Sequence, residues 1–188
     1  AAAGADLVLI ETMSDSYEAK AAVLAAKENC DLPVLVTLIF DEKGKLLTGG
    51  TVDSTVAMLE GLRVDALGVN CGLGPKQMHP IIERLTQVSS LPIIVNPNAG
   101  LPRSENGKTV FDIAPAEFSD LMEEIAGMGV QALGGCCGTT PEHLRLTIEK
   151  CRKVPFRPPV AKRRTVVSSF SQAVEIGPKP VIIGERIN

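Results

Sequence analysis

ALGVNCGLGPKQMHPIIERLTQVSSLPIIVNPN, residues 66–98, contains two short apolar runs separated by a segment with helical character. We predict strands at 66–71 and 91–98, and a helix over most of the stretch between them. Both strands are continuous apolar runs, a pattern typical of a parallel sheet that is covered on both faces. This strand–helix–strand unit indicates an α/β fold.

The same unit recurs along the chain at a spacing of roughly 30 residues. Further strands are predicted at 7–12, 33–40 and 132–137, and further helices at 15–28, 53–62, 115–126 and from Thr140-Pro141 onward. Five such units fit either an open doubly wound sheet or a (β/α)₈ TIM barrel. A full barrel takes about 250 residues, so five units suit a barrel that lacks its first three.

The composition is that of a single soluble domain: 188 residues, 45% of them hydrophobic, with a formal net charge of −3. This mildly acidic balance lacks the basic footprint of a nucleic-acid-binding protein. No apolar run approaches the roughly 18 residues that a membrane span needs, and no signal peptide is present. We therefore expect a cytoplasmic protein with no nucleic-acid and no membrane partner.

The division of the chain follows from a change of composition after Lys153. We predict one domain over residues 1–152, a proline-rich interdomain linker over 153–179, and the start of a further domain at 180–188. The chain begins directly in an apolar strand without an initiator Met, and it ends just after a strand-like run. We therefore expect a fragment of a longer protein.

Polar residues gather where the predicted strands end. They are Glu11 and Thr12, Thr37, Asn70 and Cys71, Asn96 and Asn98, and Cys136 and Cys137. In parallel α/β folds the active site forms at the carboxyl ends of the strands. One such residue is commonly a strand cap or turn former, but five strand ends in succession indicate a functional site.

Three of the five cysteines, Cys71, Cys136 and Cys137, lie at these strand ends. An odd number of cysteines in a chain of this size argues against a disulfide framework and favours metal binding or catalysis. Thiolates are soft ligands that suit zinc, and three protein ligands leave a fourth position open, as in catalytic zinc sites. We predict a zinc site formed by these three residues.

Adjacent cysteines share one metal only where the backbone leaves strand geometry, because neighbouring side chains of a strand point to opposite faces. Gly134, Gly135 and Gly138 frame the pair and permit such a bend. The alternative is a non-catalytic α/β module in which Cys136 and Cys137 are small buried core residues.

Other candidate residues carry weaker signals. Cys30 and Cys151 lie away from the strand ends, and we expect them to be structural. His79 and His143 are metal ligands in principle, but both fall within predicted helices and we do not favour them. Glu11 is the carboxylate best placed to meet a ligand's ammonium group. Asn98 is placed to hydrogen-bond an amino-acid head group. For both Glu11 and Asn98, the alternative role is a local cap or turn.

Four segments, GVNCG (68–72), GGCCGTTPEHL (134–144), LVLIET (7–12) and VNPNAGLP (95–102), closely resemble the homocysteine S-methyltransferase family. The resemblance covers residues 1 to 152 and implies a TIM barrel of which about strands 4–8 are present. It also implies that Cys71, Cys136 and Cys137, after the sixth and eighth strands, are zinc ligands, and that Glu11 and Asn98 contact homocysteine. The family's N-terminal glycine-rich motif has no counterpart here.

The linker and IIGERIN (182–188) resemble the junction between the homocysteine and folate-binding domains of cobalamin-dependent methionine synthases, one branch of this family. The resemblance implies zinc-dependent methyl transfer to the thiol of homocysteine, giving methionine. Methylcobalamin and 5-methyltetrahydrofolate would bind to cobalamin-binding and folate-binding domains of the same polypeptide, outside these 188 residues. A betaine- or S-methylmethionine-dependent enzyme is the alternative within the family.

Overall fold

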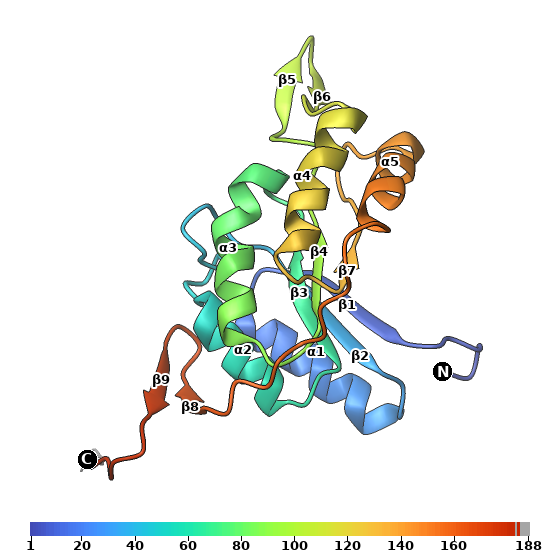
Figure 1. Cartoon of the computed structure of the whole chain (residues 1–188). Coiled ribbons are helices and arrows are strands. Elements are labelled where there is room, and N and C mark those ends of the chain that lie inside the picture. The colour runs from blue at the N-terminus through green and yellow to red at the C-terminus, as the bar shows by residue number, and fades with distance from the viewer. Residues whose placement is uncertain (183, 185–188) are drawn as a thin grey trace.

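A parallel sheet of five strands forms the centre of the protein in the computed structural model, which describes residues 1–182 and 184 (Figure 1). The strands of this sheet are β1 (Val8–Met13), β2 (Val34–Leu38), β3 (Ala66–Asn70), β4 (Ile93–Asn96) and β7 (Ala132–Leu133). The helices are α1 (Ser16–Asn29), α2 (Val52–Gly61), α3 (Pro75–Val88), α4 (Pro115–Gly127) and α5 (Pro141–Cys151). The predicted α/β fold with a parallel sheet is thus confirmed.

The strand order β1-β2-β3-β4-β7 follows the chain without reversal. Each strand pairs in parallel with the next one, for example Leu35 with Ala66 and Val69 with Val95. A doubly wound sheet, by contrast, reverses its strand order at a switch point. The doubly wound alternative is therefore wrong for the described part of the chain.

Helices α1 to α4 contribute buried residues to a single apolar core on one face of the sheet, and α5 reaches this core through the half-buried Cys151. Val34, Val36 and Leu38 point into this core, and their register partners on β3 and β4 extend it. On the opposite face Leu9 is 44% exposed and Leu35 is half-buried. Thr37 and Ile94 on the same face are buried, so among the described residues this second face is covered only in part.

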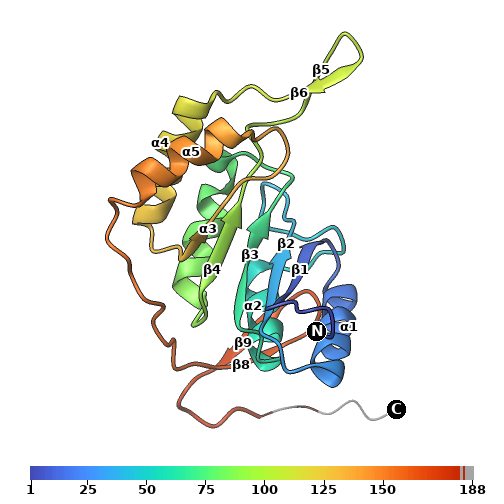
Figure 2. The same cartoon turned by 90° about the vertical axis from the view of Figure 1, so that its right-hand side faces the viewer.

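Two short hairpins lie outside the predicted elements. The first, β5 (Arg103–Glu105) with β6 (Lys108–Val110), interrupts the long loop between β4 and α4 and stands away from the body in Figure 2. Asn106 and Gly107 form its turn with φ values of 50° and 74°. Asn-Gly is the sequence that such a two-residue turn favours, because both positions require positive φ.

The second hairpin, β8 (Thr165–Ser168) with β9 (Ala173–Ile176), lies within the predicted linker and packs against the domain. The Arg164 guanidinium donates a hydrogen bond to the backbone oxygen of Val88 at the end of α3. The Ser16 hydroxyl, at the start of α1, donates to the backbone oxygen of Phe170. The last carbonyls of a helix lack intrahelical donors, so the hydrogen bond from Arg164 gives the Val88 carbonyl the partner that it needs.

The predicted further domain at 180–188 falls largely on residues 183 and 185–188, which lie outside the described residues. Among the residues that the structure describes, no helix combines the length and the apolar character that a membrane crossing requires.

Candidate metal and substrate site

The sulfur atoms of Cys71, Cys136 and Cys137 form one cluster. The Sγ atom of Cys137 lies 3.7 Å from that of Cys71 and 3.9 Å from that of Cys136, and all three lie within 4.8 Å of one another. Cys71 follows β3, whereas the other two follow β7, with β4 between the two strands. The structure thus brings together the three residues that we predicted as a metal site.

Both cysteine segments depart from strand geometry, as the adjacent pair requires. The last strand of the sheet, β7, ends at Leu133, so Cys136 and Cys137 lie in the turn that leads to α5. Gly138 has a φ of 79°, and a Cβ atom there would lie 2.3 Å from the Phe111 ring. Cys71 itself adopts a φ of 58°, which is uncommon for a residue with a side chain.

Hydrogen bonds tie the Cys136–Cys137 turn to the segment after β4. The Cys136 N–H donates to the Pro97 carbonyl at 2.8 Å, and the Cys137 N–H donates to Oδ1 of Asn98 at 3.1 Å. The Ala99 N–H in turn donates to the Cys137 carbonyl at 2.9 Å. The backbone of Cys137 is therefore held on both sides by the neighbouring segment.

Asn98 serves this turn directly, a role that the sequence did not reveal. Its side chain is almost completely buried, with 2% exposed, and its carbonyl oxygen is engaged by Cys137. The amide Nδ2 makes no hydrogen bond to any other described residue.

The electrostatics of the cluster act on the thiol of Cys136. Burial, and next the neighbouring Cys71 thiol, raise the pKa of Cys136 to about 12. Three thiolates at these separations repel one another strongly. A bound cation would offset this repulsion, and soft sulfur donors suit zinc and related metal ions.

A polar clamp lies next to Cys71 and joins β3 to β1 across the end of β2. Oδ1 of Asn70 accepts from the Thr12 N–H at 3.1 Å, and its Nδ2 donates to the Thr12 hydroxyl at 2.6 Å. Thr12 has a φ of 61° and lies where the register of β1 shifts. Between them, Thr37 on β2 has a buried hydroxyl oxygen without a partner. The strand-end pattern in the sequence marked Thr12, Thr37 and Asn70 as candidates. It did not indicate that Thr12 and Asn70 form hydrogen bonds with each other.

The remaining candidates stay outside the sulfur cluster. Glu11 is exposed, and its carboxylate forms no hydrogen bond or ion pair within the described residues. His79 is exposed on α3. Both nitrogens of His143 are engaged, Nδ1 by Thr140 and Nε2 by the Ile113 carbonyl. Neither histidine joins the described group of metal-competent residues.

Residues 1–151 match the homocysteine S-methyltransferase family.

The chain belongs to the homocysteine S-methyltransferase family.

Relatives from two organisms resemble almost the whole chain. The methionine synthases of Mycobacterium leprae (strain TN) and Mycobacterium tuberculosis (strain ATCC 25618 / H37Rv) are 34% and 32% identical over 98% of it. The chain spans only 16% of the length of either relative. The family resemblance predicted from the motifs is confirmed, and it assigns the chain to a family of methyltransferases.

Solved structures of another homocysteine methyltransferase share the fold. The oxidized form of Escherichia coli MmuM is 27% identical with a TM-score of 0.64, and it aligns over 81% of this chain and 47% of that one. The metallated form is 26% identical with a TM-score of 0.63, over 81% and 46%. The described parallel sheet and its helices therefore resemble part of that fold.

The other two cysteines of this family member lie apart from the site. The Cys30 thiol approaches the backbone oxygen of Ala26 at the end of α1, 3.4 Å away. Burial raises the pKa of Cys151, which ends α5. Both are half-buried and lie outside the sulfur cluster, and their structural role stays a prediction.

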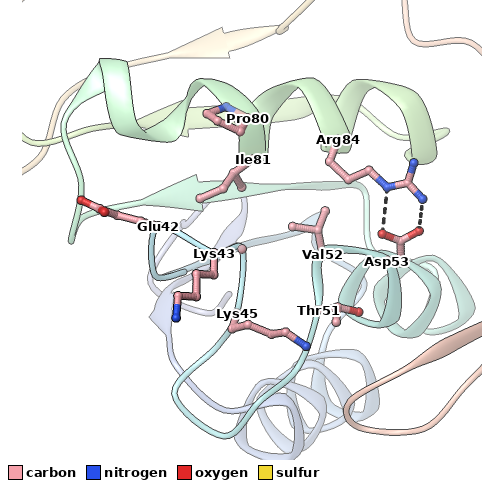
Figure 3. Close-up of a pocket in the computed structure, with 10 residues that line it drawn as sticks. Glu42, Lys43, Lys45, Thr51, Val52, Asp53, Pro80, Ile81 and Arg84 are labelled. Carbon is pink, nitrogen blue, oxygen red and sulfur yellow. Dashed lines mark hydrogen bonds and ion pairs between the residues drawn. The ribbon is translucent and has the colours of Figure 1, made fainter.

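A separate pocket of about 260 Å³ lies between the β2–α2 loop and α3 and is drawn in Figure 3. Arg84 and Asp53 form an ion pair at its edge, and the hydrogen bond from Arg84 lowers the pKa of the carboxyl. No cysteine lines this pocket. Arg84 and Asp53 are hydrogen-bonded to each other, and the pocket is separate from the three cysteines.

Proposed function

We propose that this chain is the thiol-activating part of a zinc-dependent methyltransferase that converts homocysteine to methionine. The observation that carries the proposal is the spacing of the sulfur atoms. Zinc–sulfur bonds of about 2.3 Å in a tetrahedron place the sulfur atoms about 3.8 Å apart. The observed separations of 3.7 and 3.9 Å at Cys137 fit two edges of that tetrahedron.

Cys71, Cys136 and Cys137 would hold the zinc ion and leave its fourth position to the substrate sulfur. Zinc, when bound, favours the thiolate over the thiol of homocysteine. The three cysteine thiolates and the substrate sulfur together carry more negative charge than the ion neutralises, which keeps the substrate sulfur nucleophilic. Its electron pair forms the new bond to the methyl carbon. The bond from that carbon to the donor breaks, and its electron pair leaves with the donor.

The methyl donor in this proposal is methylcobalamin, replenished from 5-methyltetrahydrofolate. Support comes from the methionine synthase relatives, of which the chain spans only 16%. This share leaves room for folate-binding and cobalamin-binding domains in the same polypeptide. Assays with different methyl donors distinguish this proposal from the betaine- or S-methylmethionine-dependent alternative. Methyl transfer from betaine or S-methylmethionine, without cobalamin, would exclude the proposed donor.

We further infer that the five strands are strands 4–8 of an eight-stranded barrel. The sequential strand order and the single helix-covered face support this inference. Three further strands between β7 and β1 would cover the apolar face on which Leu9 is exposed. A structure of a longer chain with its additional strands placed elsewhere would contradict the inference.

Cobalt substitution tests whether the site activates a thiol. With Co²⁺ in place of zinc, we expect addition of L-homocysteine to change the visible absorption bands, because a fourth sulfur enters the coordination sphere. L-methionine, whose sulfur has no proton to lose, serves as the control and should leave the bands nearly unchanged. A metal-loaded protein whose absorption bands do not change on addition of homocysteine would indicate a structural metal site. A protein that binds no metal would indicate a non-catalytic module.

Glu11 and Asn98 are proposed to bind the amino-acid part of homocysteine. The exposed carboxylate of Glu11 would pair with the ammonium group, and Nδ2 of Asn98 would donate to the head group. Glu11→Gln removes the charge while keeping the shape. We expect it to weaken homocysteine binding about tenfold, as the loss of a charged hydrogen bond of about 1.5 kcal/mol implies. Titration followed by the cobalt bands measures this, with Asn98→Ala titrated in parallel; wild-type affinity in either variant would exclude that residue.

A further inference from the structure

The side chain of His143 joins two segments that converge on the cysteine turn. It lies in the first turn of α5, 5% exposed, with its ring edge-on to Phe118. Nε2 lies 3.0 Å from the Ile113 carbonyl oxygen, and Nδ1 lies 3.1 Å from the Thr140 backbone nitrogen. A carbonyl oxygen only accepts, so Nε2 carries the proton and Nδ1 accepts from the Thr140 N–H. The ring therefore bridges the two segments with both nitrogens in use.

The bridge closes a ring of hydrogen bonds around the turn. From Ile113 the backbone N–H donates to the Ala99 carbonyl at 3.0 Å, and the Ala99 N–H donates to the Cys137 carbonyl at 2.9 Å. His143 donates to the Ile113 carbonyl and accepts from the N–H of Thr140, which lies three residues beyond Cys137. The turn that carries Cys137 is thus held from both ends, by Ala99 on one side and by His143 on the other.

We propose that His143 is a positioning residue for the metal site, acting through this ring of hydrogen bonds. Cys137 is the most exposed of the three cysteines, and its turn is glycine-rich, so its sulfur depends on this framework for its place. A metal site tolerates only small displacements of its ligands, and groups behind the ligands set their orientation. The inference rests on the zinc site proposed above.

His143→Leu tests the role, because leucine fills the space and makes neither hydrogen bond. We expect zinc transfer to a chelator to become on the order of tenfold faster, the lower end of the effect of losing an outer-sphere partner. The visible bands of the Co²⁺-substituted variant should also shift, since the geometry of the thiolates changes. His143→Gln should restore both properties in part, because its amide keeps one acceptor and one donor.

Val23→Ala is the matched control for lost stability. Val23 is fully buried in α1, away from the cysteines, so this variant should lower Tm without changing zinc release or the cobalt bands. If His143→Leu does not fold, His143→Asn is measured instead; it retains an acceptor toward Thr140 but is too short to reach Ile113.

The outcomes separate this inference from the proposed function. A wild-type protein that binds no zinc would overturn the zinc site itself. A wild-type protein that binds zinc and responds to homocysteine, together with a His143→Leu variant that releases zinc at the wild-type rate, would overturn only the positioning role. Equal acceleration in His143→Leu and Val23→Ala would also overturn it, because loss of stability alone would then account for the release.

Discussion

Replacing Cys137 with serine is expected to abolish zinc binding. The sulfur of Cys137 lies 3.7 Å from that of Cys71 and 3.9 Å from that of Cys136. A serine hydroxyl remains protonated at neutral pH and is a harder donor than a thiolate, so it does not replace the lost ligand. We expect zinc content after dialysis, measured by elemental analysis, to fall from about one equivalent to near none. Homocysteine-dependent methyl transfer should disappear with it.

Cys30→Ser provides the control for this change. Cys30 is half-buried at the end of α1 and lies outside the sulfur cluster, so its variant should keep the full zinc content. Retention of stoichiometric zinc by Cys137→Ser would contradict the assignment of Cys137 as a ligand. Loss of zinc from both variants would point instead to a general effect of thiol removal on folding.

Phe118→Ala is expected to cause the largest loss of stability. Phe118 is fully buried in α4, and its ring meets that of His143 edge-on at 5.4 Å between centroids. Truncation of a buried Phe removes its apolar burial and leaves a cavity, which costs about 3–5 kcal/mol. Since about 1 kcal/mol corresponds to a Tm shift of about 2–4 °C in a chain of this size, Tm should fall by roughly 6–20 °C.

The same substitution at Phe156 is the matched control. Phe156 is 72% exposed, so its truncation should change the free energy of unfolding by no more than about 0.5 kcal/mol. Thermal unfolding followed by circular dichroism compares the two variants directly. Equal Tm values for both would show that Phe118 contributes no more to the core than a surface residue does.

The order of the sheet strands and of the helices along the chain was predictable, because each of these elements has a recognisable sequence pattern. Continuous apolar runs such as 33–40 and 91–98 mark buried strands, and the structure places β2 and β4 within them. The last predicted strand, 132–137, is shortened to Ala132–Leu133, because the glycines there favour a turn. The β5–β6 and β8–β9 hairpins were missed, because their short and mostly exposed strands give no apolar pattern.

The candidate site was predictable to a different degree for each residue. Cys71, Cys136 and Cys137 stood out through their chemistry and their places at strand ends, and they do lie together. Asn98 was marked as polar and well placed, but its bond to the Cys137 N–H depends on how two segments 39 positions apart meet. His143 gave no sequence signal that distinguished a bridge from a metal ligand.

The sequence by itself determined the strands and helices of the central sheet, which thiols are available and to which family the chain belongs. These properties reside in the residues: apolar runs, turn formers and soft donors keep their character wherever the chain places them. Only the tertiary structure decided that one face of the sheet is covered only in part, that Asn98 and His143 brace the cysteine turn, and that Cys71 and Cys137 bring their sulfur atoms to 3.7 Å across 66 positions. Such a distance follows from strand register and from hydrogen bonds between remote segments, and these exist only once the whole sheet has formed.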